Sequence, residues 1–315
     1  MSKSIAFLKF KSTIELEIRA FWHTLAALEL SERTVRSYTK PLLTDEPGND
    51  SYPFKAISIT PKAYIDEGES VAGFVRENSL VSFITTFEAY LFEIMERMIY
   101  LDLDAISDSE MNMSAKDIIS AAKSHDSKQW LASKMAEKYL RNKTHQEMIK
   151  KIDKISKSRT FLSRTADIGE WHRWTLVRNS VVHTTRQITR ELSEDWASKF
   201  PTPGQSFNLT NQDVSRVFSL AIDLAGTIDK AAVTQVIKKA DALALAREIY
   251  IHFGISKPAE LRNKLSNCGI RTKLSNVDLD RMLSQHKRGN GLDNLTLSSI
   301  EMQRFFRPKS PVGGV

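Results

Sequence analysis

The run VAGFVRENSLVSFITTFEAYLFEIMERMIYL, residues 71–101, restricts the fold of this chain more than any other feature. It contains no proline and a single glycine, and its apolar residues recur at steps of three and four: Phe74, Val81, Ile84, Leu91, Met95 and Met98. This spacing predicts a long helix with one buried face. Residues 5–31 are also long and nearly free of helix breakers. Because only 12 Gly and 9 Pro occur in 315 residues, we expect an all-α fold rather than a turn-dense β architecture.

The remaining sequence predicts further helices separated by short breaks. They are expected over residues 114–124, 127–157, 167–196 and about 210–239, with several short helices from 241 onward. Asp167 is the expected N-cap of the helix at 167–196, with Glu170 completing a capping box. Residues 37–64 are rich in Pro, Gly, Asn and Asp, which indicates a loop region with one short strand around KAISI, residues 55–59.

These elements suggest three segments. An N-terminal helix and loop segment covers residues 1–70, a central helical domain covers 71–240, and a C-terminal segment of short helices covers 241–315. The final residues, RPKSPVGGV, are expected to form a mobile tail.

Several classes of protein are disfavoured by the composition. The one cysteine, Cys268, excludes an intrachain disulfide framework and a multi-cysteine zinc site, and fits a reducing compartment. The N-terminus lacks the apolar core of a secretory signal, and no apolar run reaches about 18 residues. Phosphate-loop, dinucleotide-binding and H-E-x-x-H zinc motifs do not occur in the sequence. We therefore expect a cytoplasmic chain without a membrane span, a bound metal or a cofactor.

Positive charge is concentrated in one region. Between Lys134 and Arg164, ten Lys or Arg residues are opposed by three acids, an excess of seven that equals the net charge of +7 of the whole chain. Such a cluster can neutralise phosphates and release their counterions. The RNA-binding candidates in it are Lys143, Lys150, Lys151 and Lys154. A solvated helix face explains the same residues equally well.

The segment VRNSVVHTT, residues 177–185, places three polar side chains on a helix that otherwise has an apolar stripe. On a helical wheel of about 100° per residue, Arg178 is expected in the middle of that stripe. Asn179 and His183 share a neighbouring face, together with His172, Arg186 and Arg190. An Arg on a buried stripe needs a partner. Glu88 interrupts the stripe of the helix at 71–101, so a contact between Glu88 and Arg178 is a natural hypothesis.

The motif RNSVVH resembles the Arg-x4–6-His pattern of the HEPN superfamily. The Asn directly after the Arg, the preceding EWHRWTLV and the upstream FEAYLFEIMER are also similar to that family, and the resemblance covers about residues 71–240. It implies a helical bundle of HEPN type that forms a homodimer, here with N- and C-terminal helical extensions. Many members are metal-independent endoribonucleases, found among toxins paired with antitoxins and among CRISPR-associated and phage-defence proteins. By this resemblance Arg178 and His183 are the catalytic pair, Asn179 orients the site, and Glu88, Arg186 and His172 are auxiliary.

The residue types fit cleavage of RNA by its own 2′-hydroxyl. Histidine can act as general acid or base near neutral pH, and arginine can hold two phosphate oxygens. The expected products are a 2′,3′-cyclic phosphate and a 5′-hydroxyl. Arg178 and His183 diverge by about 140° on an ideal helix, so they can act together through the reach of the Arg side chain, a helix distortion or a second subunit.

Two other interpretations remain open at this point. The chain can be a non-catalytic HEPN-like module for dimerisation or for binding RNA or nucleotides, or a helical interaction protein in which RNSVVH is coincidental. Trp171, Trp174 and Trp196 are expected as core or dimer-interface residues rather than as platforms for bases. The partners considered are RNA, a second copy of the chain, and an antitoxin or sensor protein.

Overall fold

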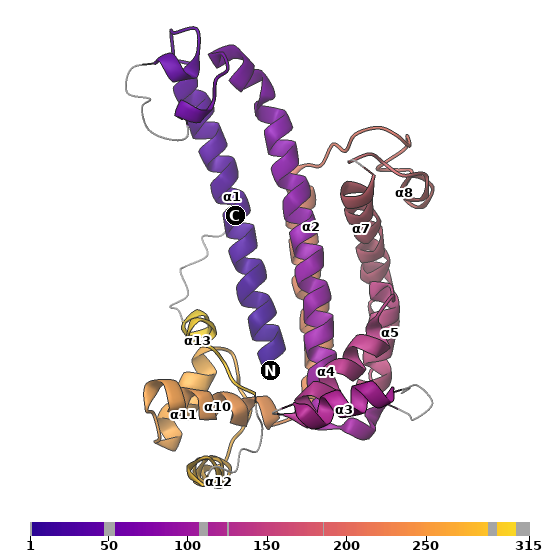
Figure 1. Ribbon diagram of the computed structural model, residues 1–315, viewed down its shortest axis with the longest axis vertical. Coiled ribbons are helices and arrows are strands. Elements are labelled where there is room, and N and C mark those ends of the chain that lie inside the picture. Colours follow the sequence, from indigo (N-terminus) through magenta and orange to yellow (C-terminus); the bar gives the residue numbers. More distant parts are fainter. Residues whose placement is uncertain are drawn as a thin grey trace. The chain divides into compact units, whose positions relative to one another are not determined.

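The structure is a computed structural model that describes residues 2–46, 54–106, 113–124, 126–184, 186–288 and 295–306. Its regular elements in these ranges are helical (Figure 1). The α-helices are α1 (Ile5–Val35), α2 (Pro61–Leu101), α3 (Ala115–Lys123), α4 (Ser127–Leu140), α5 (His145–Ser156), α6 (Thr160–Ser163), α7 (Thr165–His183), α8 (Arg190–Asp195), α9 (Asn211–Ala232), α10 (Ala240–Phe253), α11 (Pro258–Asn267), α12 (Asn276–Lys287) and α13 (Ser299–Phe305). The expected all-α class is therefore confirmed.

Short helical turns supplement these elements. Among the described residues, 3-10 turns lie at Leu43–Asp45, Phe54–Ala56 and Leu103–Ala105, and a π-helical turn at Val233–Ile237 follows α9. The only β-type pairing in the described ranges is an isolated bridge between Gln187 and Ser206. The strand expected around residues 55–59 is thus wrong, because part of that stretch forms a 3-10 turn and the rest has no regular structure.

Helix α2 is the long helix predicted over residues 71–101, and it begins earlier, at Pro61. Its start has a local cause. The Thr60 hydroxyl accepts a hydrogen bond from the Ala63 amide at 3.1 Å, and proline at the first helical position loses no hydrogen bond. None of the helices in the described ranges combines the length and the apolar character that spanning a membrane requires.

Two helices predicted as continuous are interrupted. The segment 127–157 forms α4 and α5, because Thr144 caps α5 and Glu147 returns a hydrogen bond to the Thr144 amide. The segment 167–196 forms α7 and α8, with α7 ending at His183. The expected mobile tail at 307–315 lies outside the described residues.

The chain forms two compact units, and α1, α2, α7 and α9 contribute residues to both. Unit 1 comprises Met1–Thr13, Thr86–Gly169 and Ile222–Val315, and unit 2 comprises Ile14–Thr85 and Glu170–Ala221. The three-segment division with boundaries near residues 70 and 240 stays a prediction.

Unit 2 is held together by apolar and aromatic side chains of its helices. Its buried residues include Phe21, Leu80, Phe83, Trp171, Trp174, Leu192, Val214 and Val217. The rings of Phe83 and Phe218 lie 5.9 Å apart. Trp174 packs edge-on against Trp196 at 4.8 Å, which confirms these tryptophans as structural rather than free surface rings.

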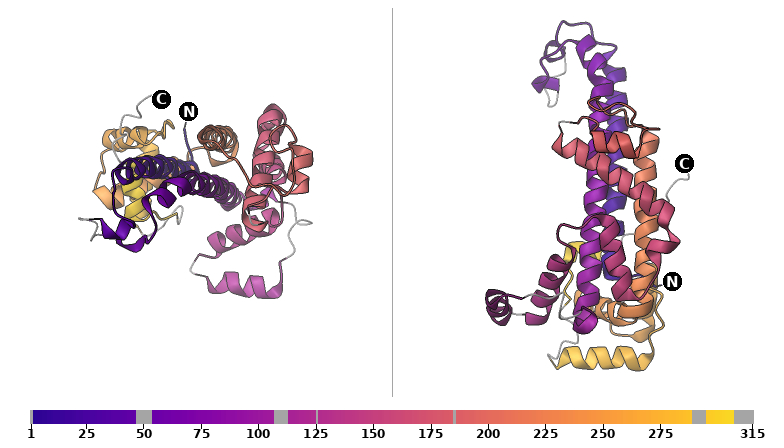
Figure 2. Two further views of the ribbon diagram at one scale, coloured as in Figure 1. Left: turned by 90° about the horizontal axis from the view of Figure 1, so that it is seen from above. Right: turned by 90° about the vertical axis from the view of Figure 1, so that its right-hand side faces the viewer.

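Unit 1 contains two groups of core residues. One lies along the second half of α2 and includes Phe87, Tyr90, Leu91, Ile94 and Met95, with the Tyr90 hydroxyl donating to the Ala225 carbonyl at 3.0 Å. The other gathers α10 to α13 around residues such as Leu245, Ile249, Leu261, Leu279 and Met302, and also includes Ile5 and Leu8 of α1. Figure 2 shows the C-terminal helices from two further sides.

Candidate functional site

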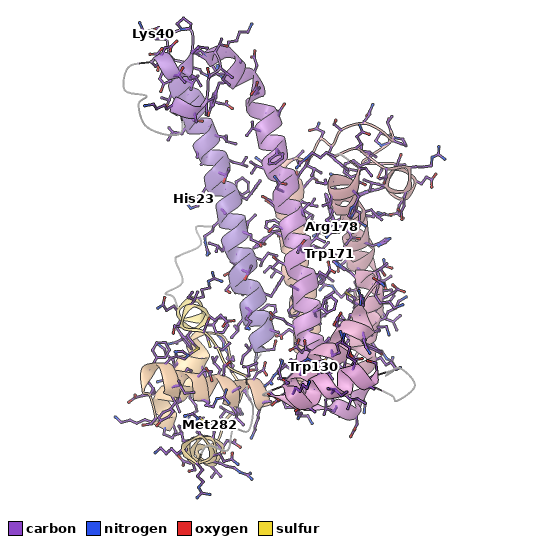
Figure 3. The ribbon with its side chains drawn as sticks, in the orientation of Figure 1. His23, Lys40, Trp130, Trp171, Arg178 and Met282 are labelled. Atoms are coloured by element: carbon purple, nitrogen blue, oxygen red, sulfur yellow. The ribbon has the colours of Figure 1, made fainter. Side chains whose placement is uncertain are left out.

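Arg178 lies at the edge of the buried face of α7, not in its middle. The buried side chains of this helix include Trp171, Trp174, Val177, Ser180 and Val181. Arg178 itself is half-buried, and Val182 beyond it is 47% exposed. The expectation of a central position is wrong because it counted Ile188, Leu192 and Trp196 on the same stripe, whereas α7 ends before them. Figure 3 shows Arg178 and Trp171 on this helix.

The guanidinium of Arg178 is only partly satisfied. Its Nη1 donates to Asn179 Oδ1 at 3.1 Å. Its Nε is buried and has no hydrogen-bond partner, and no salt bridge of Arg178 occurs in the described part of the chain. A buried donor without a partner costs about 1–3 kcal/mol. Arg178 is therefore a cation whose full set of partners is not supplied by the side chains around it.

His183 is the last residue of α7, and its side chain is exposed. It makes no hydrogen bond or ion pair with another side chain in the residues that the structure describes. Five residues of helix separate it from Arg178 by about 7.5 Å along the axis and about 140° around it. The structure thus brings Arg178 and Asn179 into contact and leaves His183 on a separate face.

Arg186 anchors the turn that follows α7. Its backbone is left-handed, with φ of 65°, which a non-glycine residue adopts at some cost in energy. The guanidinium donates to the buried carboxylate of Glu77 and to Asn78 Oδ1 at 3.4 Å. It also stands 4.1 Å from the centre of the Phe74 ring. Any role of Arg186 in holding a phosphate would compete with Glu77.

Sequence reasoning missed Glu77 as the partner of Arg186. The signal was present, because Glu77 falls between Phe74 and Val81 at helical spacing, as Glu88 does between Ile84 and Leu91. A carboxylate at such a position requires a cation or hydrogen-bond donors nearby.

The first turns of α7 also differ from expectation. The helix begins at Thr165, so Asp167 is not its N-cap and instead pairs with Arg164 at 2.7 Å. Glu170 accepts two hydrogen bonds from Arg216, at 2.9 and 2.5 Å. These bonds hold the pKa of Glu170 below its usual value. Glu170 is therefore a structural partner of α9, and the predicted capping box is wrong.

His172 lies on the same helix as Arg178, and its side chain is half-buried. Its backbone carbonyl accepts a hydrogen bond from the Thr175 hydroxyl at 2.6 Å. This contact involves the backbone alone, and an auxiliary role for the His172 side chain stays a prediction.

Glu88 and the basic candidates belong to unit 1. The carboxylate of Glu88 lies 3.6 Å from His145 Nε2. Lys143, Lys150 and Lys154 are exposed. Because Glu88 and Arg178 belong to different units, the proposed contact between them stays a prediction.

Two of the basic side chains lie against aromatic rings. The ammonium of Lys150 lies 4.3 Å from the centre of the Phe161 ring, and that of Lys151 lies 3.5 Å from the centre of the Tyr139 ring. These contacts restrain the two lysine side chains, and the charge of their ammonium groups stays near the surface.

The chain matches no known protein family. Comparisons with curated proteins and with solved structures likewise give no match. The functional proposal therefore rests on the geometry of the residues themselves.

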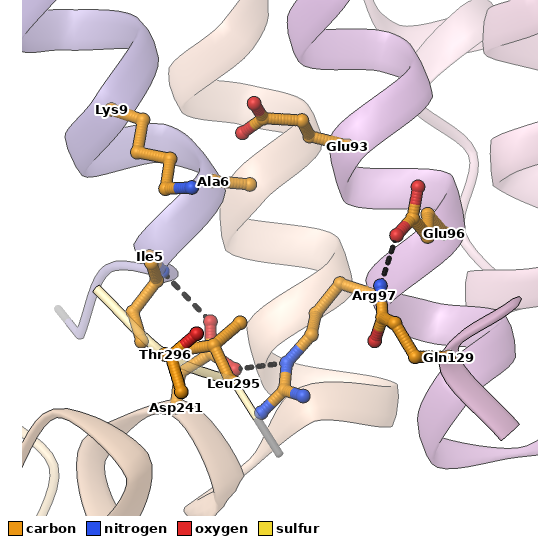
Figure 4. A pocket seen from close by; sticks show the side chains of 10 residues that line it. All are labelled: Ile5, Ala6, Lys9, Glu93, Glu96, Arg97, Gln129, Asp241, Leu295 and Thr296. Carbon is orange, nitrogen blue, oxygen red and sulfur yellow. Dashed lines mark hydrogen bonds and ion pairs between the residues drawn. The ribbon is translucent and has the colours of Figure 1, made fainter. Parts of the chain in front are cut away.

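A cavity of about 350 Å³ lies within unit 1 and contains none of these candidates (Figure 4). Its walls include Lys9, Glu93, Glu96 and the buried ion pair of Arg97 with Asp241, whose Nε and Oδ1 are 2.6 Å apart. Burial raises the pKa of Glu93 and of Glu96 above their usual values. Within the described residues, no group of three or more His, Cys, Asp or Glu side chains is placed to hold a metal ion.

Proposed function

We propose that the protein is an endoribonuclease that cleaves RNA through attack of the 2′-hydroxyl, without requiring a metal ion. In this proposal Arg178 holds the phosphate, His183 transfers a proton, and Asn179 positions the Arg178 side chain. The active site is composite, formed at the interface of a homodimer. A role as a toxin or phage-defence effector follows from the resemblance of RNSVVH to HEPN proteins.

The observation that carries this proposal is the state of Arg178. The guanidinium is half-buried, its buried Nε has no partner, and its Nη1 donates to an exposed amide, so it is poised to accept an anionic partner. The phosphodiester is a suitable anion because its oxygens match the planar donor set of arginine.

The imidazole of His183 complements this cation. It is exposed at the end of α7 and carries no competing contact among the described side chains. An accessible imidazole can remove the 2′-hydroxyl proton or donate one to the leaving 5′-oxygen. Arginine stabilises the negative charge that builds on the phosphoryl oxygens.

The proposal is tested with purified full-length protein and a fluorescent single-stranded RNA that contains all four bases, in buffer with EDTA. We expect cleavage to fragments ending in a 2′,3′-cyclic phosphate, identified by mass spectrometry. Arg178→Ala and His183→Ala should each lower the cleavage rate by about 10²–10⁴-fold. Arg173→Ala is the matched control, because Arg173 is an exposed residue of the same helix that pairs with Asp195 at 3.2 Å.

Circular dichroism establishes that each variant is folded. The proposal fails if the folded wild-type protein does not cleave, or if all variants cleave equally. Fragments with 3′-hydroxyl ends, or complete inhibition by EDTA, would also contradict it.

The alternative is a non-catalytic, HEPN-like module that dimerises or binds RNA or nucleotides. It is favoured by the divergence of Arg178 and His183 on α7. Retained RNA binding without cleavage, together with weaker binding by Lys150→Ala and Lys154→Ala, would support this alternative.

A further inference from the structure

A second concentration of positive charge lies in the C-terminal helices. From residue 257 to 288 the chain has eight Lys or Arg and three acids, an excess of five. This region is separate from the basic segment 134–164. Its charge is not explained by the proposed RNA site.

Helices α10, α11 and α12 pack against one another around a shared apolar core. α12 contributes Leu279, Met282 and Leu283 to this core. Figures 1 and 2 show α12 at the outer edge of the group. One side of α12 is thus fixed by packing, and the opposite side faces away from α10 and α11.

The outer side of α12 carries two aligned arginines. Arg281 and the C-cap residue Arg288 are both exposed and seven residues apart, which places them within about 20° on the helix and about 10.5 Å apart along its axis. Exposed Ser284 lies between them. Val277, 74% exposed, continues the same line toward the start of the helix.

These cations are not neutralised locally. Arg281, Lys287 and Arg288 form no ion pair in the residues that the structure describes, and the same holds for Arg271 and Lys273 before α12. Two of the three acids in the region already have partners, and the third, Asp280, is exposed on α12. Asp278 pairs with Lys239 at 2.9 Å, and Glu260 with Lys257 at 3.3 Å.

We propose that this outer face of α12, defined by Val277, Arg281, Ser284 and Arg288, binds double-helical DNA. An α-helix with its side chains is about 10–12 Å wide and enters the major groove of B-DNA, which is about 12 Å wide. Double-helical RNA is disfavoured because its major groove is deep and narrow.

The side chains on this face match what the groove offers. Arginine forms paired hydrogen bonds with guanine or with phosphate, and the serine hydroxyl can bond to base edges or to phosphate. The exposed valine provides an apolar contact for thymine methyl groups. The proposal goes beyond the ribonuclease activity and does not depend on it.

The test is fluorescence anisotropy with the full-length protein and a labelled 20-base-pair DNA duplex, between 50 and 200 mM salt. An RNA duplex of the same sequence, which is not the single-stranded substrate of the proposed ribonuclease, provides the comparison. We expect the DNA duplex to bind more tightly. The double variant Arg281→Ala/Arg288→Ala should weaken DNA binding by at least about tenfold and reduce the slope of log K against log salt by about 2.

Lys257→Ala is the matched control, because it removes an exposed cation from the same helices that is already paired with Glu260. Arg281→Lys/Arg288→Lys, which keeps the charge, should restore the salt slope but not the full affinity. DNA lacks the 2′-hydroxyl that the proposed cleavage requires, so DNA binding is measured apart from the ribonuclease activity.

Equal affinity for the DNA and RNA duplexes would overturn the proposal. It would also be overturned if the Arg281/Arg288 double variant, shown to be folded by its thermal transition, bound DNA as tightly as the Lys257→Ala control.

Discussion

Two buried carboxylates hold the first turn of α1. Asp229 accepts hydrogen bonds from the amide and the hydroxyl of Ser4, with the amide at 3.2 Å. Asp241 accepts from the Ile5 amide at 2.7 Å and from Arg97 Nε at 2.6 Å. Helix N-termini carry unsatisfied amides and a partial positive charge, so both acids stabilise this end. Asp241 has a nearer cationic partner than Asp229 has, so the negative charge of Asp241 is better compensated.

Asp229 makes the stability of the protein depend on pH. Burial raises the pKa of Asp229 from 3.8 to about 6. Between these values the folded protein binds more protons at this carboxyl than the unfolded chain, so the free energy of unfolding falls as pH rises. We expect the contribution of Asp229 to fall by on the order of 3 kcal/mol between pH 4 and pH 7.

Urea denaturation of wild type and Asp229→Asn, across this range, measures that contribution. The variant cannot titrate, so the difference in unfolding free energy between the two proteins should change with pH. Lys3 lies 3.9 Å from Asp229 and remains in both proteins. A constant difference from pH 4 to pH 7 would contradict the prediction.

Breaking the buried pair of Arg97 and Asp241 should be costly. The two side chains are 7% and 2% exposed, and removing one partner leaves the other charge buried without compensation. We expect Arg97→Met to lower the free energy of unfolding by about 3–5 kcal/mol. The exposed pair of Arg33 with Glu29 provides the control, because Arg33→Ala should change stability little. Equal losses in the two variants, measured by urea denaturation, would contradict the prediction.

At the scale of elements, the sequence predicted helices well and their ends less well. The helix at 114–124 was predicted with Ser114 at its start, and the structure confirms Ser114 as the N-cap of α3. The break between α4 and α5 was missed, although Thr144 and Glu147 form a capping box that is readable locally. Apolar spacing continues across such a break, so periodicity alone does not reveal it.

The end of α7 has a long-range cause. Arg186 binds Glu77, which is 109 residues away in the chain. Local spacing indicates that Glu77 needs a cation, but it does not reveal which one. Residue type and spacing identified the candidate residues, but not the face of the helix on which each one lies. Arg178 was expected in the middle of a buried stripe and lies at its edge, because the stripe was drawn through residues beyond His183.

The hydrogen bond between Glu77 and Arg186 should stabilise the turn after α7. The same turn is tied to a second segment, because the Ile188 amide donates to the Gln205 carbonyl at 2.8 Å and the Gly204 amide donates to the Ile188 carbonyl at 2.8 Å. Glu77→Gln removes a charge-assisted hydrogen bond, so we expect this turn to lose about 1–3 kcal/mol of local stability.

Amide hydrogen exchange measures this effect, with faster exchange expected at Ile188 and Gly204. Glu69→Gln is the control, because Glu69 is an exposed residue of α2 that pairs with Arg76 at 2.6 Å. Unchanged exchange at both amides in Glu77→Gln would show that Arg186 is not the anchor.

For the whole molecule, charge is distributed unevenly along the chain. The segments 134–164 and 257–288 have excesses of seven and five positive charges, and the whole chain has +7, so the remaining residues are net negative by five. Both basic segments belong to unit 1, whereas Arg178 and His183 belong to unit 2. The proposed binding of polyanions and the proposed cleavage of RNA therefore rest on separate residues, and the two proposals can be tested by separate variants.

If the active site is composite, as in the proposed function, dimers that combine two inactive variants should regain activity. Arg178 and His183 diverge by about 140° on one helix, so one subunit would supply the arginine and its partner the histidine. A dimer of one Arg178→Ala chain and one His183→Ala chain then has one intact site and one site lacking both residues. Unfolding and refolding the two inactive variants together at equal amounts should restore about a quarter of the wild-type cleavage rate, because about half the dimers are mixed.

Each variant refolded alone is the control. If the mixture of folded variants stays inactive while sedimentation shows dimers, both residues act within one chain.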